Sequence, residues 1–193
     1  MSAAGRVCTG FSKPYIANYA ESSGTITYSN GQLLARGVDV NISPDAAAEN
    51  IFHADNVEAE RDNRFTGGTL AATVDGLLPT AERMLSQLPA PVDDWYVYDD
   101  DQGNGYFGFG FIGRYMSDGV TSYVPYVLLK VSFDPIQTSA ATQESEISWQ
   151  TQSLSGKILR AGDAKHGWKN VGIEYPTEAA AEAALRTRLG ISG

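Results

Sequence analysis

The chain has 193 residues, of which 42% are apolar and 19% are charged, so one domain can bury a sizeable core. Aspartate and glutamate number 23 against 14 lysines and arginines, and the net charge of −9 argues against a protein that grips a nucleic-acid backbone. No apolar stretch approaches the roughly eighteen residues of a spanning helix, and residues 1–14 lack the apolar core of a secretory signal. We therefore expect synthesis in the cytoplasm and no membrane association.

Period-two alternation predicts three strands in the first part of the chain. Residues 14–20 alternate around Tyr15 and Tyr19, and residues 25–28 are β-branched and aromatic. A turn at residues 29–31 is expected to lead into a longer strand at residues 32–42, with a kink at the internal glycine.

The alternation is lost over residues 43–68, which are rich in alanine and acidic side chains. A loop of this length in a compact domain is usually functional or disordered. Its few large apolar residues have little reason to persist in a solvated loop, so we expect it to become ordered against a partner surface. The candidate contact residues are Ile51, Phe52, Asp55, Arg61, Arg64 and Phe65.

A further strand is predicted at residues 69–78, followed at once by a short amphipathic helix. Thr80 occupies the expected N-cap position, Glu82 falls in the first turn, and Pro89 ends the helix. Residues 92–105 are acidic and rich in turn-forming residues, and their aromatic side chains suggest a brief strand.

The strictest pattern is a predicted β-hairpin over residues 106–133, with its turn at Ser117, Asp118 and Gly119. Phenylalanines alternate with Gly108 and Gly110, and glycine within a strand marks the close approach of another segment. We expect one fully buried aromatic face. Its predicted core residues are Phe107, Phe109, Phe111, Val127, Leu129, Val131 and Phe133.

The last part of the chain predicts strands and then a helix. Strand character over residues 146–160 changes register, which indicates a bulge near Gln152. Thr177 is expected to cap an alanine-rich helix that runs to Leu189 and stops at Gly190. We therefore predict an N-terminal arm at residues 1–10, one domain at residues 11–170, and a C-terminal arm with a short helix at residues 171–193.

The chemical motifs do not form an active site. Residues 103–108 spell GxGxxG, but a strand pattern follows where a dinucleotide fingerprint requires a helix. The acidic residues 99–105 resemble a calcium loop that lacks its bidentate glutamate. Neither His53 nor His166 has a second ligand at metal-binding spacing, and Cys8 is a single thiol without a partner. We predict no catalytic residues, no metal and no cofactor.

The order and spacing of several short segments resemble the major tail proteins, or tail tube proteins, of long-tailed, non-contractile bacteriophages. The resemblance covers roughly residues 11–169, whereas the acidic insert at residues 93–104 and the helix after Pro176 have no counterpart. The matching segments are residues 15–17, 37–44, 53–56, 68–70, 108–111, 129–133, 147–156 and 167–168.

The resemblance implies a mainly β fold: a tail-tube-type β-sandwich or partial barrel with one short flanking α-helix, a long loop and a C-terminal helical arm. It implies a non-enzymatic virion protein whose hexameric rings stack into the phage tail tube, with the long loop contacting the next ring. The implied partners are further copies of the chain and the tape measure, tail terminator and distal tail proteins. DNA would pass through the lumen without specific binding.

A competing interpretation is a soluble β-sandwich module that binds a ligand such as a carbohydrate. Trp95, Tyr96, Tyr98 and Tyr106 would supply its binding platform, although aromatic residues in such a stretch more often belong to a core or an interface. An enzymatic interpretation has no site to support it.

Overall fold

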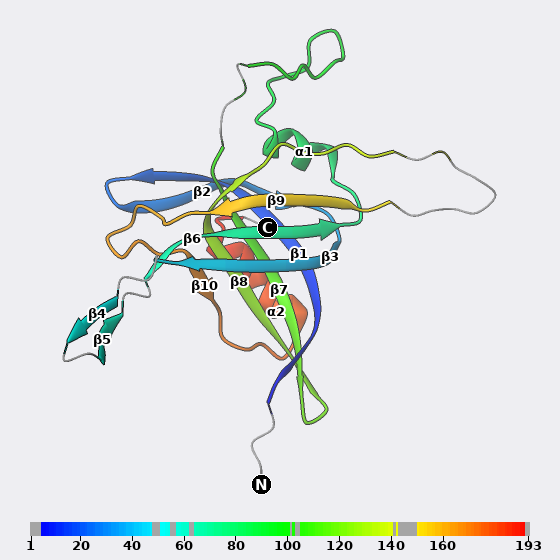
Figure 1. The fold of residues 1–193 in the computed structure, drawn as a ribbon. Helices are drawn as coiled ribbons and strands as arrows, with labels where there is room; N and C mark the ends of the chain where they lie inside the picture. Colours follow the sequence, from blue (N-terminus) through cyan, green and yellow to red (C-terminus); the bar gives the residue numbers. More distant parts are fainter. Residues whose placement is uncertain are drawn as a thin grey trace.

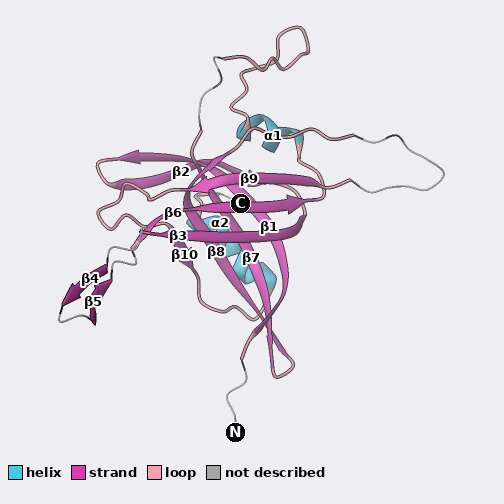
Figure 2. Cartoon of the chain, in the orientation of Figure 1, coloured by secondary structure: helices cyan, strands magenta, loops and turns pink. Residues whose placement is uncertain are grey.

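A computed structural model describes residues 5–47, 51–54, 57–61, 64–100, 102, 105–140, 142 and 150–191, with the backbone alone for residues 51–61. Within these ranges the chain is mainly β, as the sequence predicts (Figure 2). The strands are β1 (Val7–Ser22), β2 (Thr25–Leu33), β3 (Gly37–Ala46), β4 (Ile51–Ala54), β5 (Val57–Arg61), β6 (Phe65–Val74), β7 (Phe107–Ser117), β8 (Val120–Phe133), β9 (Gln152–Ile158) and β10 (Lys169–Val171). The helices are α1 (Pro79–Leu85) and α2 (Glu178–Arg188).

Eight strands form one antiparallel sheet in the order β2-β1-β7-β8-β9-β6-β3, with β10 paired to β8. The sheet does not close into a barrel, because β2 and β3 lie at its two ends. Figure 1 shows β3, β6 and β9 crossing steeply in front of β1, β7 and β8. Two layers therefore arise from one folded-over sheet rather than from two separate sheets.

The main core lies between these two layers. Phe107 and Phe109 of β7 are almost fully buried there, together with Leu70 and Val74 of β6. Phe133 packs its ring against both phenylalanines, with centroids 6.0 Å away in each case. The aromatic alternation of β7 therefore builds the interior, as the sequence predicts.

The β7–β8 hairpin forms with its turn at Asp118 and Gly119, but its core residues occupy two faces rather than one. The pairing register shifts between Phe107 and Phe109, which moves part of β8 to the opposite side of the sheet. Phe111, Val131 and Phe133 pack in the main core, whereas Val127 and Leu129 belong to a second cluster. The expectation of a single buried face was therefore wrong for these two residues.

The second cluster forms because α2 covers the outer side of β1, β7 and β8 (Figure 1). Leu185 and Leu189 of the helix are fully buried against this face. Gly110 makes the approach possible, since a β-carbon there would lie 2.6 Å from Leu185 Cδ1. The helix expected in a C-terminal arm thus completes the domain, and it is capped as predicted by Thr177, whose side chain accepts from Ala180 N at 3.3 Å.

We expect Leu185→Ala to lower the free energy of unfolding by about 2–5 kcal/mol, because it leaves a cavity between α2 and the sheet. Urea denaturation followed by circular dichroism measures the change. Leu78→Ala is the matched control, since Leu78 is 43% exposed and its truncation should cost less than about 0.5 kcal/mol. Equal losses in the two variants would contradict the packing of α2.

A polar contact fixes the other side of α2 to β1. The Tyr15 hydroxyl donates to Glu182 Oε1, and Lys13 Nζ lies 3.3 Å from Glu182 Oε2. Burial and the Glu182 contact raise the pKa of Tyr15 to about 12. Partial burial acts to raise the pKa of Glu182, but the hydrogen bonds from Tyr15 and Lys13 outweigh it and hold that pKa below its usual value. The folded state therefore favours the ionised carboxylate.

This linkage predicts a loss of stability in acid. A depressed carboxylate pKa stabilises the fold fully above the ordinary value of 4.5, and the contribution disappears as the pH falls through the folded-state value. Thermal unfolding between pH 7 and pH 3 should therefore show a smaller decrease in Tm for Glu182→Gln than for the unmodified chain. Parallel decreases would mean that Glu182 contributes nothing to the acid response.

The break between the second and third strands lies later than expected. β2 continues through Asn30, which adopts φ 52°, and pairs with β1 as far as Leu33. The predicted turn at residues 29–31 is therefore an irregularity within a strand. The chain turns instead before Gly37, where Arg36 forms an ion pair with Asp75 that lowers the pKa of this carboxyl group.

Other features also differ from the sequence-based expectation, and β6 runs from Phe65 to Val74 rather than over residues 69–78. β1 begins at Val7 and pairs with the end of β7, so part of the expected N-terminal arm lies in the sheet. α1 starts two residues earlier than predicted, with Leu78 rather than Thr80 at the N-cap and a proline at N1. β9 pairs with β6 in unbroken register from Gln152 onward, so the expected bulge does not lie within this strand.

Candidate assembly surfaces

A β-hairpin projects from the sheet where the sequence predicts a long loop. Its strands β4 and β5 pair only with each other among the described strands, and Figure 1 shows them standing away from the main sheet. The β3–β6 pair is extended toward this hairpin by one hydrogen bond, which Ala47 N donates to Arg64 O at 2.8 Å. The prediction of a loop without strands over residues 43–68 was therefore wrong.

The predicted contact residues divide between the hairpin and the domain. Phe65 begins β6, is partly buried, and stacks on Trp168 with ring centroids 4.3 Å apart. This packing makes Phe65 part of the chain's own core, whereas Arg64 is exposed at the hairpin base. Ile51, Phe52 and Arg61 lie in β4 and β5, whose side chains are not described, and Asp55 lies outside the described residues.

The two ends of the sheet offer edges for pairing with another chain. β2 has a neighbour on one side only among the described strands and contains neither a charged residue nor a proline. β3 carries Asp39, Pro44 and Asp45, which are the residue types that discourage edge pairing. β2 is therefore the less protected edge.

The outward face of β3, β6 and β9 is lined by short side chains. The strands align so that Asn41, Ala71 and Ser155 form one row across the sheet. These positions alternate with the buried residues of the core and therefore face outward. Because most of their side chains are short and neutral, the face is smooth and mostly uncharged. Its outward residues are Asp39, Asn41, Ser43, Thr69, Ala71, Thr73, Ser153, Ser155 and Lys157.

A run of large apolar side chains lies exposed beyond α1. Trp95 is 75% exposed and Tyr98 is 56% exposed, and the brief strand expected here is reduced to one bridge between Val92 and Trp95. We call residues 92–100 the acidic-aromatic segment. Its exposed apolar members are Val92, Trp95, Tyr96, Val97 and Tyr98, and its acidic members are Asp93, Asp94, Asp99 and Asp100.

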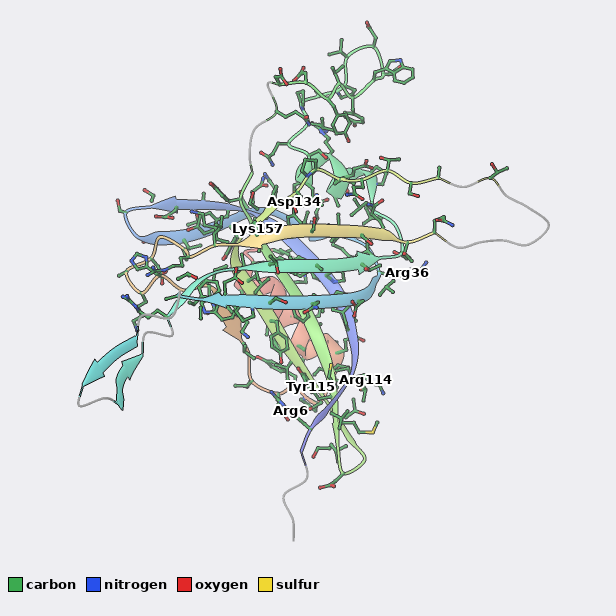
Figure 3. The ribbon with its side chains drawn as sticks, in the orientation of Figure 1. Arg6, Arg36, Arg114, Tyr115, Asp134 and Lys157 are labelled. Atoms are coloured by element: carbon green, nitrogen blue, oxygen red, sulfur yellow. The ribbon has the colours of Figure 1, made fainter. Side chains whose placement is uncertain are left out.

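Exposed cations collect on a different part of the molecule. They lie in the loop from residue 159 to residue 168, which also carries Asp163, and in β10. Figure 3 shows Lys157 toward the end of β9 from which this loop departs. We call the set of Arg160, Lys165 and Lys169 the basic surface.

An open groove of about 630 Å³ lies between α1 and the end of β2. Tyr96 lines it beside several amide side chains, a combination suited to a polar ligand. The amides are partly occupied, since Gln32 Nε2 donates to Thr80 O and Gln87 Nε2 donates to Met84 O. The Arg83 guanidinium also lies 5.8 Å from the centre of the Tyr96 ring.

The residues considered for chemistry remain scattered. Cys8 is exposed, and His166 lies in the loop between β9 and β10, while His53 belongs to β4. Within the described ranges, no three histidine, cysteine or acidic side chains are arranged to hold a metal ion. None of the helices described here has the length and apolar character to cross a membrane.

The chain matches no protein-family model and no curated protein sequence.

Proposed function

We propose that this chain is the structural subunit of a phage tail tube, in which hexameric rings stack and conduct DNA from capsid to host cell. The observation that carries the proposal is the projecting β4–β5 hairpin. It occupies the chain position at which the tail-tube resemblance expects a segment that contacts the next ring. A two-stranded hairpin is only marginally stable alone, so contact with a partner surface would stabilise it.

Lateral assembly is supported by the open sheet. A long, uncharged edge such as β2 invites aggregation in an isolated monomer, but a neighbouring subunit that pairs with it satisfies its backbone groups. Around a ring, the β2 edge of one copy would contact a different surface of the next copy. A heterologous contact of this kind produces a closed ring when the rotations between successive subunits add up to one full turn.

The smooth outward face of β3, β6 and β9 fits the role of a lumen wall. Short hydroxyl, amide and methyl groups offer DNA few contacts, and Asp39 and Lys157 are the charged residues among its outward positions. DNA must slide past such a wall, so neither a continuous cationic lining nor a sequence-reading surface is needed.

Assembled tubes should not retard DNA, even at low salt. Each copy carries a net charge of −9, and a lumen wall without clustered cations offers no counterion release. Electrophoretic mobility of a duplex fragment mixed with purified tubes measures this. Retardation that weakens steeply with salt would show that the basic surface remains open to DNA in the assembly.

The second candidate function is carbohydrate binding, favoured by the groove beside Tyr96. Against this function, Gln32 and Gln87 already donate to backbone carbonyls, and Arg83 lies over the Tyr96 ring. Sedimentation velocity across a concentration series separates the two functions. Discrete hexamers and larger species support the tube, whereas a monomer at every concentration, with measurable glycan affinity, supports the binding module.

A further inference from the structure

The acidic-aromatic segment presents apolar side chains that lie outside both core clusters. Each of its five large apolar side chains is at least 47% exposed. No lysine or arginine occurs in the sequence between Arg83 and Arg114, and Arg83 itself lies beside the Tyr96 ring. Exposed tryptophan and tyrosine with a charged rim form the composition of an interface centre.

The base of the segment is fixed although its tip is exposed. Val92 and Trp95 exchange two backbone hydrogen bonds of 2.9 Å, around Asp93 and Asp94 with positive φ angles of 50° and 67°. Gln102 Nε2 donates to Ser86 O at 2.9 Å, which ties the returning chain to the residue that follows α1. Figure 1 shows this part of the chain extending past α1. A backbone turn that is already formed need not be ordered on binding, which lowers the entropic cost of the contact.

The basic surface has complementary properties. It gathers exposed cations on a chain that is acidic overall, and it includes an aromatic component because Lys169 Nζ lies 4.8 Å from the centre of the Trp168 ring. Trp168 is held in place by its stack on Phe65. The carboxylates of the acidic-aromatic segment can therefore meet these cations, and its tryptophan and tyrosine rings can contact lysine and arginine side chains.

We propose that the acidic-aromatic segment of one copy docks on the basic surface of a neighbouring copy. This inference rests on the proposed self-assembly and adds a second contact beside the β4–β5 hairpin. The two surfaces are different parts of the molecule, so the contact is heterologous and leaves one free surface of each kind at the ends of a series. It also covers the cations that would otherwise attract DNA.

Charge reversal tests the pairing. Asp94→Lys/Asp100→Lys gives a chain with two basic surfaces, and Arg160→Glu/Lys165→Glu gives a chain with two acidic ones. Each variant alone should self-associate at least about tenfold more weakly than the unmodified chain in sedimentation velocity. An equimolar mixture should recover association, because the altered segment of one variant meets the altered surface of the other. Failure of the mixture to recover would overturn the pairing.

The apolar part of the contact has its own test. Trp95→Ala should weaken self-association by about tenfold or more, as expected for a central interface tryptophan. Val120→Ala is the matched control, because Val120 is 69% exposed on the distant β7–β8 turn and should change nothing. Circular dichroism shows whether both variants keep the fold. Equal association of Trp95→Ala and the unmodified chain would overturn the inference.

The experiments distinguish a wrong docking contact from a wrong tail-tube proposal. Tubes that form normally from both charge-reversed variants would overturn the docking contact and leave the tail-tube proposal intact. An unmodified chain that stays monomeric in every assay would overturn both. Loss of tubes in each single variant, with recovery in the mixture, supports both.

Discussion

Phe109→Asp should yield insoluble protein. Phe109 is completely buried, with its ring 6.0 Å from that of Phe133 and 5.9 Å from that of Phe111. An aspartate there would bury an unpaired charge at a cost of about several kcal/mol, within a total stability of about 5–15 kcal/mol. The soluble fraction after expression and the circular dichroism spectrum measure the effect.

Val120→Asp is the matched control for this substitution, since it introduces the same side chain into the same hairpin at a site that is 69% exposed. It should leave solubility and the β signal unchanged. A soluble, normally folded Phe109→Asp protein would contradict the assignment of the core between the two layers.

Replacing residues 48–63 with a short Gly/Ser linker should abolish tubes and leave the domain folded. The replaced residues include β4 and β5, which pair only with each other among the described strands. Closing a shorter loop changes the free energy of unfolding only slightly, so the sheet should persist. Circular dichroism measures the fold, and negative-stain microscopy measures the assembly. Tubes of normal length from this variant would refute the contact role of the hairpin.

The boundaries of this replacement matter. A wider replacement of residues 45–65 would also remove Phe65 from its stack on Trp168 and shorten the β3–β6 pair. We expect the wider replacement to lower the free energy of unfolding, which would confuse loss of assembly with loss of fold. Comparison of the two replacements by urea denaturation separates these effects.

The central hairpin could be predicted because its signals are local. Alternating phenylalanine and glycine specify a strand, and Asp118 with Gly119 specifies the turn. The shift of Val127 and Leu129 to the other face could not be predicted, because it depends on a bulge in the pairing of two strands. Sequence periodicity describes one strand and contains no information about its register against a partner.

The covering of the sheet by α2 was predicted only in part. The glycines of β7 indicated a close approach, and the capped helix was recognised, but the sequence did not show that one packs on the other. Contacts between Gly110 and Leu185 join distant parts of the chain, which local patterns do not connect. The same limit explains why β10, a three-residue strand paired to β8, was missed.

The candidate surfaces also differ in how far the sequence predicts them. The sequence predicts a loop where the β4–β5 hairpin lies, because the two short strands lack strong alternation. The exposure of Trp95 and Tyr98 had a usable signal, namely aromatic residues among aspartates with no lysine or arginine between Arg83 and Arg114. That combination is unfavourable for burial, since nearby carboxylates would have to be desolvated without partners.

Negative-stain electron microscopy of the concentrated, purified chain tests the central proposal most directly. The tail-tube function predicts rings with six-fold symmetry and tubes built from stacked rings, without any other protein added. Uniformly dispersed monomers at every concentration, in low and in physiological salt, would contradict it.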